Sequence, residues 1–441
     1  MPPRTYVVVH GGAGVHSKNS DAEVKKALRL ACTQALTSTP AIETSPSALD
    51  LVENAIVSLE DSPLLNAGYG SNLTLAGTVE CDAALMDGRT GDFGSVGAVS
   101  GIKNPVRLAR LIFEHARVPD PLGRIPPLNL VSQGAHAFAA VRGDEGKQGD
   151  LLVPPESLVS PRAWKSWEVW KARLDGALAS SSSSSTPAAR LPDTVDDLMV
   201  PETRVEDQDL DSAMVDLHAL QDTVGAVAFV ASSASSTSNS SIASGVSSGG
   251  ILLKHPGRVG EAAIFGAGCW AHASASDSSG PVDGKRGMAC SVSGAGEYIV
   301  RANLARAIVK AIEDASSSLP PSASSASPSI SPAKESDEDF GDEDVDVHAI
   351  LQCVLAEEFW LPSRSPTNPD PSAGVVLLTT EEDEAGEIVA RLWCAFTTPS
   401  MAIAYASSEH PLGKALILRR PKSVESRPTD QPRIFVTGIA L

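Results

Sequence analysis

The most informative segment of this sequence is Gln221-Asp222-Thr223-Val224-Gly225-Ala226-Val227-Ala228-Phe229-Val230. Its apolar part, residues 224–230, has the length and composition of a buried strand. The preceding residues, about 178–222, are rich in serine and acidic side chains without sustained periodicity, which predicts a flexible loop. Thr223 therefore stands where a loop ends and a buried strand begins. A β-branched residue is ordinary at a strand start, so its meaning depends on the rest of the chain.

Composition narrows the class of protein. The chain has 441 residues, 42% hydrophobic residues and a net charge of -19. The charge argues against nucleic acid as a partner, since such binders carry a positive field. No run of about 18 apolar residues predicts a membrane span, and the apolar N-terminal run is too short for a secretory signal. With no clear nuclear-import cluster either, we expect a cytoplasmic or nuclear protein without membrane contacts.

The cysteines point to no metal chemistry. There are six of them, spread widely and without a Cys-x-x-Cys pair. Dispersed cysteines in a chain without an export signal are most simply buried, reduced thiols. Since clustered cysteine or histidine ligands are also absent from the sequence, we expect no metal and no cofactor.

Periodicity along the chain predicts a mixed architecture. A second acidic, low-complexity stretch, about residues 316–346, is predicted to be disordered. Elsewhere, groups of strands joined by hairpins alternate with helices, which favours an α+β fold of two mostly antiparallel sheets with helices outside. The expected helices are 20–38, 47–60, 104–116, 161–178, 297–314 and 347–360. The expected strands are 5–10, 83–86, 95–99, 224–230, 242–247, 374–379, 389–398, 401–405 and 415–418.

Four other blocks give Thr223 its significance. They are His10-Gly11-Gly12-Ala13-Gly14; Asn66-Ala67-Gly68-Tyr69-Gly70-Ser71 leading to Cys81-Asp82-Ala83-Ala84-Leu85-Met86-Asp87-Gly88; Ser247-Ser248-Gly249-Gly250 followed by Lys254-His255-Pro256-Gly257-Arg258-Val259-Gly260; and Ser293-Gly294-Ala295-Gly296-Glu297. Together with Asp222-Thr223-Val224-Gly225, these blocks resemble, in the same order, the N-terminal-nucleophile asparaginase family. Within that family they most resemble the threonine aspartase (taspase) branch.

The resemblance implies a four-layer αββα sandwich of the N-terminal-nucleophile type. It also implies self-cleavage of the Asp222–Thr223 bond. The products would be an α subunit, residues 1–222, and a β subunit, residues 223–441, which stay together as one structural domain. Members of the family commonly pair two such units, so an (αβ)2 assembly is expected.

The chemistry of Thr223 follows from its hydroxyl. A threonine hydroxyl is a poor nucleophile and needs an adjacent base. Cleavage before Thr223 would give it a free α-amine with a reference pKa of about 8, which can accept the hydroxyl proton. No histidine is needed, and none is adjacent to Thr223 in the sequence.

The resemblance assigns roles to further residues. Ser293 and Gly294 match the position that stabilises the oxyanion, and Ser248 matches a hydroxyl that hydrogen-bonds the nucleophile. Arg258 matches the arginine that binds the substrate carboxylate, for which a guanidinium is suited by shape and charge. The substrate-binding residues are completed by Gly12, Asn66 and Gly68, which are expected to shape the pocket.

Glu261 departs from the asparaginase pattern. Asparaginases have at this position an aspartate that holds the free α-amine of a small substrate. The longer glutamate favours an endopeptidase, which cuts protein substrates after aspartate, typically at Asp-Gly sites, and has no free amine to hold. The alternative is an L-asparaginase or isoaspartyl peptidase. A third hypothesis, a binding scaffold without activity, conflicts with the intact Thr223 and Arg258.

Overall fold

The computed structural model describes most of the chain. The described residues are 4–37, 46–142, 151–183, 223–231, 240–273, 287–318, 345–382, 388–428 and 430–441. Within them, mixed helix and sheet confirms the α+β prediction. None of the helices in these ranges is both long and apolar enough to cross a membrane.

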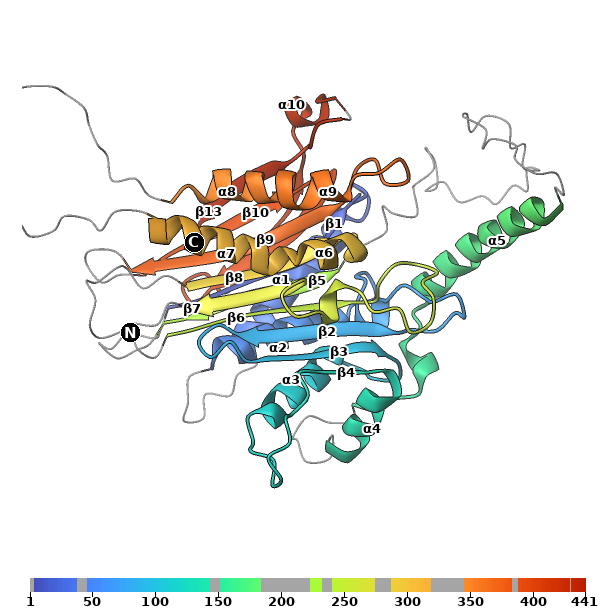
Figure 1. The fold of residues 1–441 in the computed structure, drawn as a ribbon, viewed down its shortest axis with the longest axis horizontal. Coiled ribbons are helices and arrows are strands. Elements are labelled where there is room, and N and C mark those ends of the chain that lie inside the picture. The colour runs from blue at the N-terminus through green and yellow to red at the C-terminus, as the bar shows by residue number, and fades with distance from the viewer. Residues whose placement is uncertain are drawn as a thin grey trace, which may run out of the picture.

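The larger of two sheets contains β5 (Val224–Val230), the strand that directly follows Thr223, among its inner strands (Figure 1). Its eight described strands run in the order β12-β11-β1-β5-β6-β2-β3-β4. Neighbouring strands are antiparallel except β3 and β4, which are parallel. The bounds are β1 (Thr5–Gly14), β2 (Cys81–Asp87), β3 (Phe93–Val99), β4 (Asn129–Val131), β5 (Val224–Val230), β6 (Ser241–Ser248), β11 (Ser400–Ser407) and β12 (Lys414–Arg419).

The smaller sheet is antiparallel throughout its described strands, in the order β13-β10-β9-β8-β7. It packs against the larger sheet through a hydrophobic cluster that contains Val8, Val227, Leu392, Phe396 and Met401. The bounds are β7 (Cys269–Ala273), β8 (Gly287–Gly294), β9 (Ala373–Glu382), β10 (Ile388–Phe396) and β13 (Phe435–Ala440).

The side chains of β5 explain why residues 224–230 form a strand. Val227 and Phe229 belong to the cluster between the sheets, whereas Val224, Ala226 and Ala228 belong to the cluster on the other face. Successive side chains of a strand point to opposite faces, so a continuous apolar run suits a strand that is covered on both sides. β5 is also paired along both edges, with β1 and β6.

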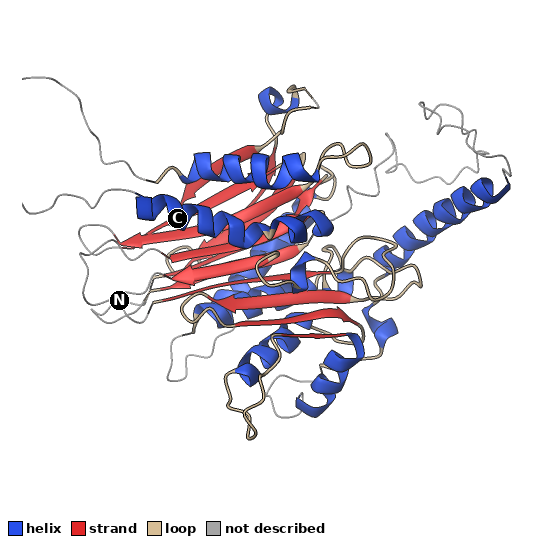
Figure 2. Ribbon diagram, viewed as in Figure 1, coloured by secondary structure: helices blue, strands red, loops and turns tan. Residues whose placement is uncertain are grey.

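Helices cover the outer faces of both sheets (Figure 2). Leu28 of α1 and Ile56 of α2 lie in the cluster behind the larger sheet, and Ile308 of α7 and Leu351 of α8 lie in the cluster over the smaller one. α5 extends away from the body of the molecule (Figure 1). The bounds are α1 (Asp21–Thr37), α2 (Ala48–Glu60), α3 (Pro105–Ala116), α4 (Ser132–Arg142), α5 (Pro161–Ser183), α6 (Gly296–Ala302), α7 (Leu304–Ser318), α8 (Val347–Cys353), a π-helical segment (Val354–Trp360), α9 (Leu361–Ser363) and α10 (Lys422–Glu425).

The prediction of one continuous helix over 297–314 is wrong. The sequence pattern indicates a single helix over 297–314, but the structure has α6 and α7 separated by Asn303. Asn303 has a left-handed backbone, with φ 49° and ψ 48°. Asparagine tolerates this conformation, which ends a helix. The chain therefore turns at Asn303 before α7 begins.

The predicted loops begin later than expected. α5 continues to Ser183 and α7 to Ser318, and Asp346 caps α8 by accepting a hydrogen bond from the Ala349 N–H. The rest of the two predicted loops, residues 184–222 and 319–344, lies outside the described residues, and Asp222 lies there too. The predicted helix 347–360 is divided into α8 and the π-helical segment.

We predict that Leu392→Ala destabilises the protein by about 2–5 kcal/mol, because it leaves a cavity between the sheets. Leu392 is fully buried, whereas Val389 on the same strand is 48% exposed. Val389→Ala is the matched control, with an expected change within about 0.5 kcal/mol. Urea unfolding measures both. Equal losses for the two variants would contradict the described packing of β10.

Candidate active site

Thr223 lines a small pocket near the ends of β5, β6 and β8. Its side chain is buried, with 3% of the residue exposed. The cavity measures about 10 Å³, which is about the room that one water molecule needs. The lining residues are Asn66, Thr223, Ser248, Gly250, Ile251, Arg258, Glu261 and Gly294. The structure thus brings together five of the predicted site residues, and Glu261 with them, from segments far apart in the chain.

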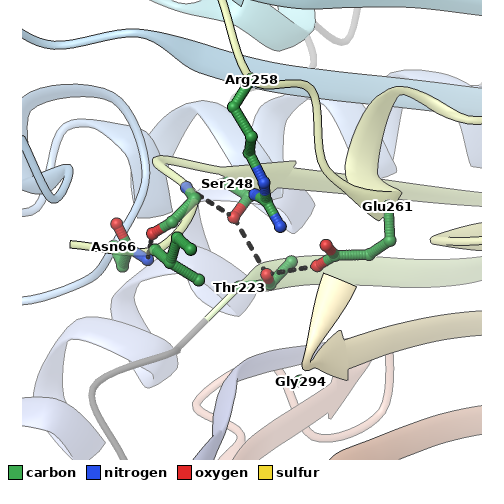
Figure 3. Close-up of a pocket in the computed structure, with 8 residues that line it drawn as sticks. Asn66, Thr223, Ser248, Arg258, Glu261 and Gly294 are labelled. Atoms are coloured by element: carbon green, nitrogen blue, oxygen red, sulfur yellow. Dashed lines mark hydrogen bonds between the residues drawn. The ribbon is translucent and has the colours of Figure 1, made fainter. Parts of the chain in front are cut away.

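The Thr223 hydroxyl lies in a directed chain of hydrogen bonds (Figure 3). It donates to Glu261 Oε1 at 2.6 Å and lies 3.0 Å from Ser248 Oγ. Ser248 Oγ in turn accepts from the Gly250 N–H at 3.0 Å. Since Thr223 has one hydroxyl proton, the Ser248 hydroxyl is the donor between the two. The order of donation therefore runs from Gly250 through Ser248 and Thr223 to Glu261.

The strands and turns that carry these residues direct their side chains into the pocket. Thr223 directly precedes β5, and Ser248 is the last residue of the neighbouring β6. Glu261 opens a 3-10 helix, Glu261–Ala263. The turn before that helix is anchored by Asp82 of β2, whose Oδ2 accepts from the Gly260 N–H at 2.8 Å. Buried Asp82 thereby fixes the position from which Glu261 reaches Thr223.

Arg258 enters the same pocket and is paired with Glu297 of α6. Its Nε donates to Glu297 Oε1 and its Nη2 to Oε2, both at 2.8 Å. A Cβ added at Gly296 would collide with Arg258 Nη2 and Glu261 Oε2. Glycine at 296 therefore lets the guanidinium and the Glu261 carboxylate approach the same stretch of backbone. The guanidinium of Arg258 thus binds the Glu297 carboxylate through two parallel hydrogen bonds, which is also how it would bind the carboxylate of a ligand.

Burial controls the charge of Glu261. Burial raises the pKa of its carboxyl group, and the nearby Asp82 raises it further, whereas Arg258 and the hydrogen bond from Thr223 lower it. A charged group out of water favours its neutral form unless an opposite charge compensates. Arg258 is that compensation, so the ionisation of Glu261 depends on the arginine.

Asn66 lines the pocket, but its side-chain amide is hydrogen-bonded to neighbouring backbone groups. Its Nδ2 donates to the Gly250 carbonyl at 2.9 Å, and its Oδ1 accepts from the Asn72 N–H at 2.8 Å. Asn72 Nδ2 also donates to the Gly250 carbonyl. The two asparagines hold the loop that presents the Gly250 N–H to Ser248.

Gly12, Gly68 and Ser293 are not among the residues that line the described pocket. Gly12 has φ 102° and lies where the register of β1 shifts. Ser293 Oγ accepts from the Ala13 N–H next to this shift, at 3.2 Å. Gly68 begins a 3-10 helix and packs against the backbone of Glu60. Their proposed contributions to binding and to the oxyanion stay predictions.

The sequence missed two neighbours of the site. The first is Glu297, whose pairing with Arg258 needs the turn between β8 and α6. The second is His10, whose Nε2 lies 2.8 Å from Ser291 Oγ. Burial lowers the pKa of His10 to about 3, with a smaller opposing effect of the Thr223 backbone, so the ring is neutral at pH 7. A histidine is therefore close to Thr223 in space, although none is adjacent in sequence.

The arrangement suits nucleophilic attack by a hydroxyl. The Thr223 oxygen has an acceptor for its proton in Glu261 and a donor that can stabilise it in Ser248. Gly294, at the end of β8 with φ 140°, brings backbone to the pocket. Arg258 provides a cation for an acidic ligand.

Comparisons with known proteins identify the family of this chain. A family model described as asparaginase matches residues 3–341. The plant-type L-asparaginase of Pyrococcus furiosus is 32% identical over 302 residues, covering 68% of this chain and 77% of that protein. The isoaspartyl peptidase/L-asparaginase of Homo sapiens is 33% identical over 308 residues, covering 70% and 76%. The isoaspartyl peptidase of Escherichia coli is 30% identical over 301 residues, covering 68% and 74%.

A match over most of the chain, with relatives at this identity, shows the family. The residues of the pocket around Thr223 lie within the matched range. The chain therefore belongs to the asparaginase family of N-terminal-nucleophile hydrolases.

Proposed function

We propose that this chain is a self-cleaving threonine hydrolase that acts on amide bonds of aspartyl substrates. The observation that carries the proposal is the placement of the Thr223 hydroxyl in one pocket with Arg258. Cleavage of the Asp222–Thr223 bond gives Thr223 its own α-amine, which then serves as the base in turnover. Ser248 stabilises the nucleophile, and Gly294 with Ser293 contributes to the oxyanion site.

Arg258 is the proposed determinant of substrate charge. Its guanidinium binds the substrate carboxylate bidentately, as it binds Glu297 in the structure. The substrate carboxylate must replace Glu297, and the pocket must widen, because the present cavity has room for about one water molecule. We expect the pocket to widen after cleavage of the Asp222–Thr223 bond.

Two substrate classes fit this chemistry. The comparisons support the first more directly: relatives that match this chain are named L-asparaginase and isoaspartyl peptidase. Asparagine or a β-aspartyl dipeptide would place its α-carboxylate on Arg258 and its side-chain amide against Thr223.

The second candidate is a threonine endopeptidase that cuts proteins after aspartate. Glu261 favours it, because its carboxylate is engaged by the Thr223 hydroxyl and buried beside Arg258, and is poorly suited to hold a free ammonium group. The sequence blocks around Cys81 and Lys254 favour the same candidate through their likeness to the taspase branch.

The proposal includes the expected processing and assembly. Residues 1–222 and 223–441 form the two subunits, in a four-layer αββα sandwich. The three hydrophobic clusters, one between the sheets and one beneath the helices on each side, support this layering. The (αβ)2 assembly is part of the proposal by family likeness alone.

Processing is tested by the mass of the purified protein. We expect fragments that correspond to residues 1–222 and 223–441, with a new N-terminus at Thr223, because only that bond frees the proposed nucleophile. Thr223→Ala should remain a single inactive chain. Thr5→Ala, which replaces another buried threonine at a strand start, should still be processed. Full activity in an uncut chain would refute the proposal.

The substrate class is tested by assaying processed protein on asparagine, a β-aspartyl dipeptide and a peptide with an internal Asp-Gly bond. Turnover of the small amides alone supports the asparaginase candidate, and cleavage of the internal bond alone supports the endopeptidase. Release of ammonia and mass spectrometry of the peptides measure the two reactions. Failure to hydrolyse any of them would overturn the aspartyl specificity.

Arg258→Lys should raise KM for the accepted substrate about 10–100-fold, because a lysine keeps the charge but loses the paired hydrogen bonds. Arg110→Lys is the matched control, since Arg110 pairs with Asp50 and Glu53 away from the pocket. Steady-state kinetics measure both variants. An unchanged KM in Arg258→Lys would remove Arg258 from carboxylate binding.

A further inference from the structure

Self-cleavage raises a problem of proton transfer. In the uncut chain the nitrogen of Thr223 is part of a peptide bond, so the α-amine that serves as the base in turnover does not yet exist. The hydroxyl of Thr223 still has to lose its proton as it attacks the preceding carbonyl. Another group must therefore accept that proton in the first cut.

We infer that Glu261 is the proton acceptor for self-cleavage of the uncut chain. Its Oε1 accepts the hydrogen bond of the Thr223 hydroxyl at 2.6 Å, which is within the range expected for a general base. The inference rests on the self-cleavage in the proposed function and adds a catalytic residue to that step.

The other polar groups of the pocket do not compete for this role. Ser248 donates to Thr223, and Arg258 is a cation without acceptor capacity. Asn66 uses its amide on Gly250 and Asn72. Among the residues that line the described pocket, Glu261 is the one carboxylate. The hydrogen-bond chain that starts at the Gly250 N–H therefore ends on Glu261.

The surroundings of Glu261 make its carboxylate more basic than that of an ordinary glutamate. Burial and Asp82 raise the pKa of its carboxyl group, and Arg258 opposes them. Glu297 also pairs with Arg258, so the positive charge of the arginine is shared between two carboxylates. A carboxylate with a raised pKa is a stronger proton acceptor than an exposed glutamate, provided that it is ionised.

The step balances without any further reactant except water. The Thr223 oxygen attacks the carbonyl carbon of Asp222 while its proton moves to Glu261. The carbon–nitrogen bond then breaks, and Glu261 returns the proton to the Thr223 nitrogen. An ester on the Thr223 oxygen and a free amine result. Water hydrolyses the ester, which releases the new carboxyl group of Asp222.

The test follows processing of full-length chains made by cell-free translation. Glu261→Gln keeps the shape of the side chain but cannot accept the proton, so cleavage should slow about 100-fold or more. Glu261→Asp, which retracts the carboxylate, should slow less. Glu53→Gln is the matched control, because Glu53 is a buried glutamate of α2 with a pKa raised by burial to about 7, but it does not line the pocket. Cleavage of Glu261→Gln at the wild-type rate would overturn the inference.

The pH dependence gives an independent readout. The base must be ionised, so the wild-type cleavage rate should rise with pH, with a midpoint above the ordinary range of a glutamate. Glu261→Asp should keep a rising profile at a lower rate, even if Glu261→Gln fails to fold. A flat wild-type profile between pH 4 and 8, or profiles of equal shape in the glutamine and aspartate variants, would contradict the assignment.

Hydroxylamine separates the two chemical stages, because it cleaves an ester without needing the protein's base. If Glu261 acts in ester formation, hydroxylamine does not restore cleavage of Glu261→Gln; restoration would move the defect to ester hydrolysis and overturn the inference. Failure of the substrate assays alone would leave this result standing, since processing is measured without substrate. Normal processing of Glu261→Gln would remove only the role of Glu261 and leave the proposed function intact.

Discussion

The pairing of β5 along both edges constrains everything in the site. β1 and β6 hydrogen-bond its two sides, and hydrophobic clusters cover both of its faces. A strand held in this way has no freedom to shift, so the residue before its first position is fixed as well. Thr223 is therefore held rigidly by β5, the strand that follows it. This rigidity allows a single hydroxyl to meet Ser248 and Glu261 together, which a loop residue would do only at a large cost in conformational entropy.

The second constraint is the balance of buried charge. Asp82, Arg258, Glu261 and Glu297 form a continuous group in which each carboxylate lies near the arginine or near another acid. Removing one charge from such a group leaves its neighbours uncompensated. The identity of residue 261 therefore affects more than one contact. A longer side chain at this position reaches the nucleophile, and its ionisation is tied to the arginine proposed to bind substrate.

The described strands at the C-terminal end of the chain complete the fold beyond the matched family region. That region ends at residue 341, whereas β9, β10, β11, β12 and β13 all follow it. β11 pairs with β1, and β9 pairs with β8, whose end reaches the pocket at Gly294. The site thus depends on residues of the chain's last quarter that provide no lining side chain. They act by holding β1 and β8 in register.

The local pattern of the sequence was sufficient to predict many of the helices and strands. The sequence placed β1, β5 and β9, and α1, α2 and α3, within a few residues of their observed bounds. It missed the strands β4, β7, β8 and β13 and the helices α4, α9 and α10. β8 contains Gly287, Ser291, Ser293 and Gly294, which are typical of turns, and it is a strand because β7 and β9 pair with it on both edges.

Sequence blocks also identified Thr223, Ser248, Arg258, Asn66 and Gly294 as candidate site residues, but spacing along the chain did not say which of them meet. The tertiary structure was needed to show that Glu261 accepts the hydrogen bond of Thr223, that Glu297 pairs with the guanidinium of Arg258, and that Gly12, Gly68 and Ser293 are not among the residues that line the described pocket. The reason is physical. Periodicity reports which face of an element is buried, whereas a hydrogen bond depends on distances of a few tenths of an ångström between strands and turns that are far apart in sequence.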